Sequence, residues 1–316
     1  MKIPYRIGCA GLLADIPLMV AHAKGYLPTE EIDVALSVEL GWASIELKLA
    51  SGQLSAANVP PSFPLLLALK KSGSAQPMQT LAITSYHGEA ITLNRETAAL
   101  FQTGKSGTLK TLRIGVDAPY SLSHLFVQSW LKTSRLERNP TVQLVPLAIS
   151  QLLELLKDGY IQGFCCAEPI SQIALESEIG LTMARSRDYP QLHIQSVLAA
   201  TDTACSAHPG ASKAIAAGVE RARVYCANPK HEADILRIYR KQMQHRLSLS
   251  AQSLGGPGQA PALSSLIGFE PGLSTGHASN KDPFGALAGA CSTLPGVTAA
   301  EREIREAVKR IFSSLP

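Results

Sequence analysis

The sequence predicts an α/β fold in which parallel-rich sheets are flanked by helices and divided between two lobes. Short apolar runs alternate with helical patterns along the first 200 residues, as they do in parallel sheets. The same strand and helix pattern starts again after the glycine-rich segment 104–107. The 316 residues also exceed the usual length of one domain, so two lobes fit the size of the chain.

The composition is that of a folded protein without a nucleic-acid partner. Hydrophobic residues make up 46% of the chain and charged residues 17%. The 29 basic and 25 acidic residues give a net charge of +4 without a sustained basic run, which argues against nucleic-acid binding. The six cysteines form no CxxC pair, so we expect buried thiols in a reducing compartment, or disulfides if the chain is secreted. We expect no metal site and no cofactor.

The first 23 residues partly imitate a secretory signal, with Lys2 and Arg6 ahead of an apolar stretch. Asp15 and Pro17 interrupt this stretch, and cleavage after Ala23 would remove the first predicted strand. We therefore expect a cytoplasmic protein; a periplasmic one would follow if the N-terminus is incomplete. No apolar run reaches the roughly 20 residues that span a bilayer, so we expect no membrane insertion.

The elements of the first lobe follow from apolar spacing and from the positions of Gly and Pro. Pro17 suits the first turn of a helix that ends at Gly25, and Gly52 ends a helix over 43–51. Pro60 and Pro61 break the chain before Ser62, which can cap the next helix. The predicted strands are 5–8, 32–40, 54–59, 78–84 and 90–93.

The second lobe is predicted from three further strands and two helices. Its strands are 112–116, 142–147 and 161–167, and its helices begin near Leu122 and Gln151. After a returning strand over 196–201, helices are expected at 211–226, 232–246 and 299–313, with a Gly/Pro-rich loop at 254–261. We expect a first lobe formed by 1–92 and 191–316 and a second formed by 93–190.

Several catalytic motifs are excluded by spacing. The segment ending Gly104-Lys105-Ser106 lacks the first glycine of a phosphate-binding loop, because position 99 is alanine. His231 and Glu232 do not start an HExxH helix, since position 235 is Ile235. Neither GxSxG nor GxGxxG occurs. Standard hydrolases, metalloproteases and dinucleotide enzymes are therefore not indicated, although triads assembled in space are left open.

Polar and aromatic side chains cluster at the predicted strand ends, where open α/β sheets bind ligands. The candidate residues are Trp42, His87, Glu89, Tyr120, His124 and Glu168. Helix N-termini in the turns after Trp42 and around Tyr120 suit anions. Each candidate also has a structural alternative: Trp42 can staple a strand to a helix, His124 can cap a helix at the surface, and Glu168 can bond backbone N–H groups.

A family resemblance rests on segments that recur in a fixed order: 8–26, Gly41-Trp42-Ala43-Ser44, 88–92, 123–125 and 166–169. With these segments the chain resembles nitrate- and bicarbonate-binding proteins, the solute receptors of ABC transporters, and their cytosolic sensor relatives. The resemblance spans about 4–290 and implies a two-lobed, type II periplasmic-binding-protein-like clamp with a discontinuous first domain. By position, Trp42 would form an apolar wall of the pocket, with Glu89 and His124 contributed by opposite lobes.

Three positions depart from the pattern of nitrate binders. One is Ile170, which follows Glu168 and Pro169 where the motif continues with tryptophan. Glu89 stands where a neutral amide is usual, and an ionised carboxylate would repel an anion. Ser196 stands where a basic residue is expected, although His193 is near. Either His124 and His193 supply positive charge, or the ligand is not nitrate.

The resemblance implies a non-catalytic clamp that closes over a small solute or anion, as an ABC-transport receptor or a cytosolic sensor. Its partner would be an ABC permease or a cytosolic regulatory protein. Related folds also serve in thiamine-pyrimidine and menaquinone pathways, where Glu89, His124 and Glu168 would perform acid–base chemistry. A structural relative without a ligand is a third alternative.

Overall fold

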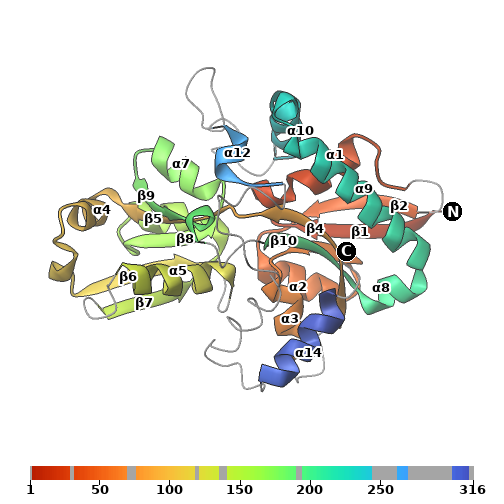
Figure 1. The fold of residues 1–316 in the computed structure, drawn as a ribbon, viewed down its shortest axis with the longest axis horizontal. Coiled ribbons are helices and arrows are strands. Elements are labelled where there is room, and N and C mark those ends of the chain that lie inside the picture. Colours follow the sequence, from red (N-terminus) through yellow and green to blue (C-terminus); the bar gives the residue numbers. More distant parts are fainter. Residues whose placement is uncertain are drawn as a thin grey trace.

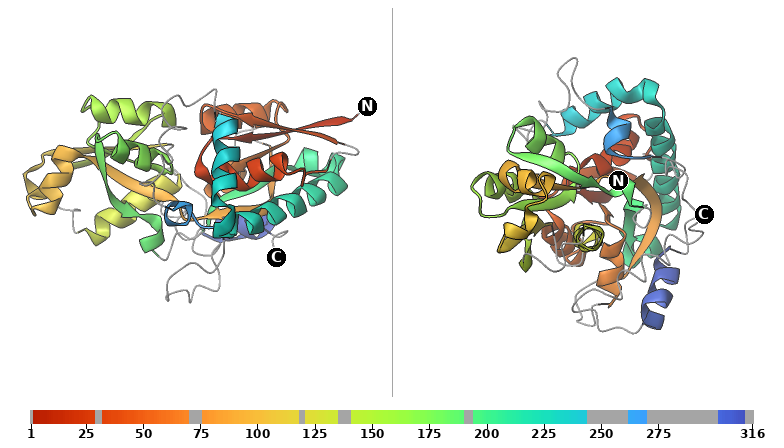
Figure 2. Two further views of the ribbon diagram at one scale, coloured as in Figure 1. Left: turned by 90° about the horizontal axis from the view of Figure 1, so that it is seen from above. Right: turned by 60° about the vertical axis from the view of Figure 1, so that its left-hand side comes forward.

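Two lobes lie side by side along the long axis of the molecule, each with one five-stranded sheet covered by helices (Figure 1). Figure 2 shows the same separation of the lobes from above. The computed structural model describes residues 2–28, 32–69, 76–117, 121–134, 141–189, 194–243, 262–269 and 301–312.

The first sheet has the strand order β2-β1-β3-β10-β4. β1 runs parallel to β2 and β3, whereas β10 runs antiparallel to β3 and β4. The inner strands β3 and β10 are buried along their whole length, which explains their mostly small and apolar residues. The strands are β1 (Ile3–Cys9), β2 (Ile32–Val38), β3 (Ala56–Val59), β4 (Met78–Tyr86) and β10 (Ile194–Thr201).

Helices cover both faces of the first sheet. α1, α9 and α10 lie on one face, and α2, α3 and α14 lie on the other (Figure 1). Each group seals its own apolar cluster. The helices of this lobe are α1 (Ile16–Ala23), α2 (Trp42–Ala50), α3 (Ser62–Leu69), α8 (Asp202–Ala207), α9 (Pro209–Ala227), α10 (Glu232–Met243), α12 (Leu263–Leu266) and α14 (Glu301–Phe312).

The second sheet has the order β7-β6-β8-β5-β9. β6 runs parallel to β7 and β8, and β5 runs antiparallel to β8 and β9. The strands are β5 (Glu89–Asn94), β6 (Thr111–Val116), β7 (Thr141–Pro146), β8 (Gly163–Ala167) and β9 (Gly180–Arg185). The helices are α4 (Arg95–Gln102), α5 (Leu122–Thr133), α6 (Leu152–Lys157) and α7 (Ile170–Glu176).

Alternation along β8 shows how the second lobe packs. Phe164 and Cys166 join the cluster beneath α6 and α7, whereas Cys165 joins the cluster beneath α4 and α5. Both cysteines are buried thiols, as are Cys9 and Cys226. Cys165 and Cys166 therefore pack on opposite faces of β8.

In the described part of the chain, two crossing segments lead from one sheet to the other: 87–88 between β4 and β5, and 186–189 after β9, on the way to β10. Gly88 has a φ of +109°, a conformation that favours glycine, and an added Cβ would meet Ile267 at 3.4 Å. Ile267 belongs to the segment after α12, whose Gly268 pairs with Tyr86 at the end of β4. Residues 262–269 therefore pack over the first crossing.

The predicted limit between the lobes, at residues 92 and 93, falls inside β5. All of β5 pairs in the second sheet, so the change of sheet occurs between Tyr86 and Glu89. The alternation of strands and helices in the sequence does not reveal which sheet a strand joins. This explains why the predicted limit lies within β5 and not before it. The division of the chain into two separate domains stays a prediction.

Most predicted elements are confirmed with ends shifted by a few residues, whereas α4, α7, α8, α12 and β9 were not predicted. The predicted loop at 254–261 lies outside the described residues. Within the described residues, no helix has the length and apolar character to cross a lipid bilayer.

Candidate functional site

The turn between β2 and α2 places Trp42 in the first turn of α2. The buried carboxylate of Glu39 accepts hydrogen bonds from the hydroxyls of Ser37 at 2.6 Å and Ser44 at 2.8 Å. It also accepts one from the Lys48 ammonium at 2.8 Å. Glu39 thus ties the end of β2 to the first two turns of α2, and the indole projects from a fixed turn at the carboxyl end of a parallel strand.

Trp42 reaches across from the first lobe to the second. Its indole Nε1 donates a hydrogen bond to Asp117 Oδ2 at 2.5 Å. Asp117 directly follows β6, so it stands at the carboxyl end of a parallel strand in the second sheet. The other oxygen, Oδ1, is buried and accepts no hydrogen bond from the described part of the chain. Within the described residues, the indole of Trp42 is therefore the hydrogen-bond donor of this carboxylate.

Trp42 and Asp117 both line a cavity of about 570 Å³ between the lobes. The first turns of α2 and α3 wall it on one side, and the segments before α5 and between β7 and α6 wall it on the other. Phe63, Leu66 and Leu147 make much of its lining apolar. The volume and the mixture of apolar walls with a few polar groups are those of small-molecule sites.

A second cavity, of about 670 Å³, adjoins the first, because Leu40 and Ile149 line both. The ends of β1 and β2 and the helices α6, α7 and α10 surround it. Its lining is mainly aliphatic, with Glu154 and Lys157 on α6. The carboxyl ends of parallel strands from both sheets thus meet around two neighbouring cavities, in agreement with the predicted location of a ligand site.

Glu89 opens β5 directly after the first crossing and is almost fully buried. Its Oε2 accepts a hydrogen bond from the Ser123 hydroxyl at 3.0 Å, and its Oε1 accepts one from Gln195 Nε2 at 3.0 Å. Burial, together with the negative charge of Asp117, raises the pKa of Glu89 to about 8. The raised pKa favours the neutral, protonated carboxyl, and the expectation that Glu89 repels an anion stays a prediction.

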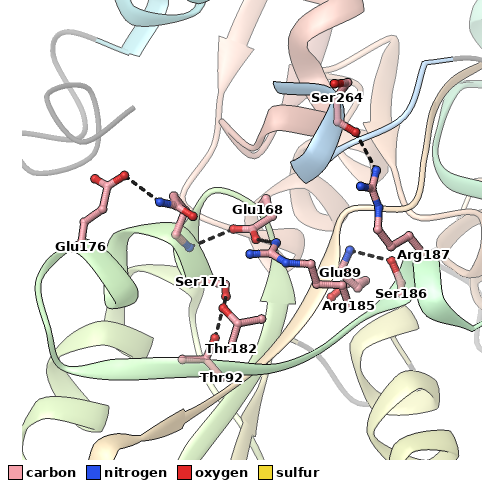
Figure 3. A network of polar contacts seen from close by, with 11 residues as sticks. Glu89, Thr92, Glu168, Ser171, Glu176, Thr182, Arg185, Ser186, Arg187 and Ser264 are labelled. Atoms are coloured by element: carbon pink, nitrogen blue, oxygen red, sulfur yellow. Dashed lines mark hydrogen bonds and ion pairs between the residues drawn. The ribbon is translucent and has the colours of Figure 1, made fainter. Parts of the chain in front are cut away.

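Glu89 also connects the two crossing segments. Its backbone N–H donates to the Ser186 hydroxyl at 3.1 Å, and Gln195 belongs to β10 in the first sheet. Next to Ser186, Arg187 donates to the Ser264 carbonyl oxygen at 2.6 Å and so reaches α12 (Figure 3). Residues from β5, the second crossing, β10 and α12 therefore form one network where the lobes join.

Glu168 follows β8 and forms a buried ion pair with Arg185, in which Arg185 Nη1 lies 2.5 Å from Glu168 Oε1 (Figure 3). Its Oε2 accepts a hydrogen bond from the Gln172 backbone N–H at 3.0 Å. Burial raises the pKa of Glu168, and the Arg185 guanidinium acts against that rise. This arrangement matches the structural alternative, in which Glu168 bonds a backbone N–H group.

Ser196 lies in a buried polar network beneath the first sheet's carboxyl edge. Its hydroxyl is 2.5 Å from Thr84 Oγ1 and 2.7 Å from Ser85 Oγ. Asn58 continues the network by donating to Asp15 Oδ1 at 2.6 Å. Burial raises the pKa of Asp15 to about 6, against the hydrogen bond from Asn58. Ser196 is thus bonded to neighbouring protein hydroxyls.

No histidine is among the described residues that line the cavity of about 570 Å³. His124 lies in the first turn of α5, where its Nε2 is 3.2 Å from Gln128 Nε2, and burial lowers its pKa. Burial thus favours the neutral imidazole over the charged one. His87 is buried in the first crossing with a φ of +57°. The predicted site residues Tyr120 and His193 lie outside the described residues.

Of the predicted site residues that the structure describes, Trp42 lines the cavity of about 570 Å³, whereas the others are not among its lining residues. Those others are His87, Glu89, His124, Glu168 and Ser196. Asp117 was missed, although it carries the signal used for the others, a polar side chain directly after a predicted strand. The described residues contain no group of three or more His, Cys, Asp or Glu side chains that could hold a metal ion.

Comparison with known proteins identifies the family. The sequence model of the NMT1-like family matches residues 2–239. The chain belongs to the NMT1-like family. Its relatives include nitrate- and bicarbonate-binding proteins, so the resemblance found from the sequence motifs is confirmed.

Two curated relatives illustrate the match. The bicarbonate transport ATP-binding protein CmpC of Synechococcus elongatus is 29% identical over 241 residues, which cover 72% of this chain and 36% of that protein. The nitrate/nitrite binding protein NrtA of the same organism is 23% identical over 251 residues, 73% of this chain and 57% of that protein. This chain spans little more than a third of CmpC.

Among solved structures, the periplasmic nitrate-binding protein NrtA from Synechocystis superposes with a TM-score of 0.80. The match covers 99% of this chain and 86% of that one, at 16% identity. Similarity at this identity shows the fold. The predicted periplasmic-binding-protein-like clamp is confirmed, with sheets that each combine parallel and antiparallel pairs.

Proposed function

We propose that this chain is a solute-binding clamp of the nitrate, nitrite and bicarbonate receptor type, whose lobes close over a solute in the cavity of about 570 Å³. The observation that carries the proposal is the pair Trp42 and Asp117, which come from different lobes, line one cavity and bond to each other. A solute held there touches both lobes. Its binding free energy then favours the closed arrangement over an open one.

The proposed role is binding without turnover. The relatives carry the names of binding proteins and of transport components. The residues expected to perform acid–base chemistry in the enzymatic alternative, Glu89, His124 and Glu168, are absent from the described lining of the cavity. Glu89 and Glu168 are instead bonded to protein groups. The enzymatic alternative on this fold stays a prediction.

The closed form would signal to a protein partner. For a transport receptor this partner is an ABC permease, and for a sensor it is a cytosolic regulatory protein. Several relatives are named as ATP-binding proteins of bicarbonate or nitrate transport, and this supports a place beside such a transporter. The cytoplasmic location remains a prediction.

Native mass spectrometry of freshly purified protein tests the proposed function. We expect a retained small molecule in the wild type and its loss from Trp42→Ala, because that change removes a wall of the cavity. Leu47→Ala is the matched control: Leu47 lies on the same helix and its side chain is 70% exposed. Equal retention by Trp42→Ala and Leu47→Ala would contradict the proposal. Conversion of the retained molecule during incubation would favour the enzyme.

A further inference from the structure

The described segment 262–269, which contains the short helix α12, is tied at both ends to the first lobe. The Leu263 backbone N–H donates a hydrogen bond to Glu232 Oε1 at 2.7 Å, and the Phe269 carbonyl oxygen accepts one from Arg223. Glu232 begins α10 and Arg223 belongs to α9. Hydrogen bonds in which one partner is ionised are stronger than those between neutral groups, so these two contacts fix the segment on the first lobe.

The same segment packs on the first crossing, residues 87–88. Gly268 exchanges two backbone hydrogen bonds, of 2.8 and 2.7 Å, with Tyr86, the last residue of β4 before the crossing. An added Cβ on Gly88 would meet the Ile267 side chain at 3.4 Å, so Ile267 packs directly against the Gly88 backbone. Ile267 is itself buried. A rotation of the backbone at residues 87–88 therefore disturbs the packing of Ile267.

The segment also bonds to the second crossing, residues 186–189. Arg187 donates to the Ser264 carbonyl oxygen at 2.6 Å (Figure 3). The neighbouring Ser186 hydroxyl accepts the Glu89 backbone N–H at 3.1 Å, which links this crossing to the residue that follows the first one. One segment fixed on the first lobe therefore contacts both described connections between the sheets, and Figure 1 shows α12 between the two lobes.

A two-lobed protein opens when a few backbone torsions rotate in the segments that join its lobes. In the arrangement seen here the lobes touch, because Trp42 donates to Asp117 at 2.5 Å and the Leu13 backbone N–H donates to the Glu168 carbonyl oxygen at 2.9 Å. The contacts of residues 262–269 are made with the crossings in this closed arrangement. Contacts that exist in one of two arrangements favour that arrangement by their free energy.

We propose that residues 262–269 act as a strap across the hinge, which holds both crossings in the closed arrangement and so sets how readily the lobes open. This inference rests on the proposed function, because it takes the two lobes to open and close as a clamp. No residue of the strap is among the described lining of the cavity of about 570 Å³. A loss of strap contacts therefore shifts the clamp toward the open arrangement without changing that lining.

The fluorescence of Trp42 reports the opening of the lobes. The chain has two tryptophans, so Trp130→Phe leaves Trp42 as the single one, and all strap variants are made in this background. Opening separates the indole from Asp117, and acrylamide should then quench its fluorescence more strongly. The radius of gyration, measured by small-angle X-ray scattering, is a second readout that a local change around Trp42 does not move.

Arg187→Met removes the donor to Ser264 and keeps an unbranched apolar side chain. Arg187 is partly exposed, so the variant should stay folded, and the ratio of open to closed protein should rise about threefold. The quenching constant and the radius of gyration should both increase. The matched control is Arg95→Met: Arg95 donates to the Glu178 carbonyl oxygen at 3.4 Å within the second lobe, so its loss should change neither value.

Ile267→Ala removes the side chain that packs on Gly88. It should raise the ratio of open to closed protein by at least the same factor, because loss of a buried isoleucine costs more than loss of a partly exposed hydrogen bond. The matched control is Ile215→Ala on α9, which removes an equally buried side chain within the first lobe. That control should lower the melting temperature without raising the quenching constant. If Ile267→Ala does not fold, Ile267→Val makes the same comparison with a smaller loss.

Equal quenching constants and radii of gyration for each strap variant and its control would overturn the inference, and so would a decrease in either value. A response to only one of Arg187→Met and Ile267→Ala would also overturn it, because the segment would then hold a single crossing. The two proposals fail differently. If Asp117→Ala, which breaks the lobe contact directly, enlarges the radius of gyration and the strap variants do not, the clamp stands and the strap falls. If Asp117→Ala also leaves the radius unchanged, both fall.

Discussion

The hydrogen bond between Trp42 and Asp117 offers the sharpest perturbation of the lobe contact. Trp42→Phe keeps an aromatic ring but removes the indole N–H that lies 2.5 Å from Asp117 Oδ2. Hydrogen bonds to charged groups contribute about 1.5–3 kcal/mol, and the partial exposure of this pair reduces that to about 1–2 kcal/mol. Since about 1.4 kcal/mol is a factor of ten, the closed arrangement should lose roughly 5- to 30-fold in population relative to the open one.

A double-mutant cycle measures this contribution. Urea unfolding of the wild type, Trp42→Phe, Asp117→Ala and the double variant isolates the coupling between the two side chains. We expect a coupling of about 1–2 kcal/mol in favour of the native pair. Small-angle X-ray scattering of Trp42→Phe should also show a larger radius of gyration, because opening separates the lobes.

Trp130→Phe is the matched control for this variant. Trp130 is buried in the second lobe, where its ring stacks on Phe101 at 5.6 Å between centroids. The variant Trp130→Phe should lower the stability of that lobe without changing the radius of gyration of the protein. A coupling below about 0.3 kcal/mol between Trp42 and Asp117, or equal scattering from all variants, would refute the reasoning.

Three further predictions concern the surroundings of the site. Burial and the charge of Asp117 raise the pKa of Glu89 from its ordinary 4.5 to about 8. The contribution of Glu89 to the free energy of unfolding is therefore fully present below pH 4.5, and it is lost as the pH rises from there through 8. Relative to Glu89→Gln, the wild type's free energy of unfolding should fall by up to about 1.4 kcal/mol per pH unit in that window, and a flat difference would disprove it. Arg185→Ala leaves the buried Glu168 carboxylate without its ion-pair partner and should lower the free energy of unfolding by about 3 kcal/mol at pH 7. The double variant Glu168→Gln, Arg185→Met should recover most of that loss. Equal stability of the single and double variants in urea unfolding would count against this. A Cβ on Gly218 would clash with the Tyr26 carbonyl oxygen, so Gly218→Ala should lower the free energy of unfolding by about 1–3 kcal/mol. Gly210 lies on the same helix, and a Cβ there meets nothing within 4 Å, so Gly210→Ala should melt no lower than the wild type.

Local sequence patterns predicted the position of Trp42 well. A strand ending near Val38, a glycine and a helical pattern together put the ring at a sheet edge, and the structure places it in the first turn of α2. The contacts of Glu39 with Ser37, Ser44 and Lys48, which hold that turn in place, were not predicted, because they depend on the directions in which the side chains point. The order of the family motifs along the sequence predicted the two-lobed clamp, which the number of strands and helices alone does not specify.

Long-range contacts explain what the sequence did not reveal. Glu89 is held by Ser123 and Gln195, which lie 34 and 106 residues away, so its burial and raised pKa follow only from the folded chain. Asp117 stood at a predicted strand end, yet nothing local distinguishes a strand end that faces the other lobe from one that does not. The displaced limit at residue 92 has the same origin, since β5 could have joined either sheet.

The most direct test of the clamp is a crystal structure of the protein with the solute that mass spectrometry identifies. The account predicts density for that solute between α2 and α5, in contact with Trp42 of one lobe and Asp117 of the other. Density confined to the surface of a single lobe, away from both residues, would contradict it.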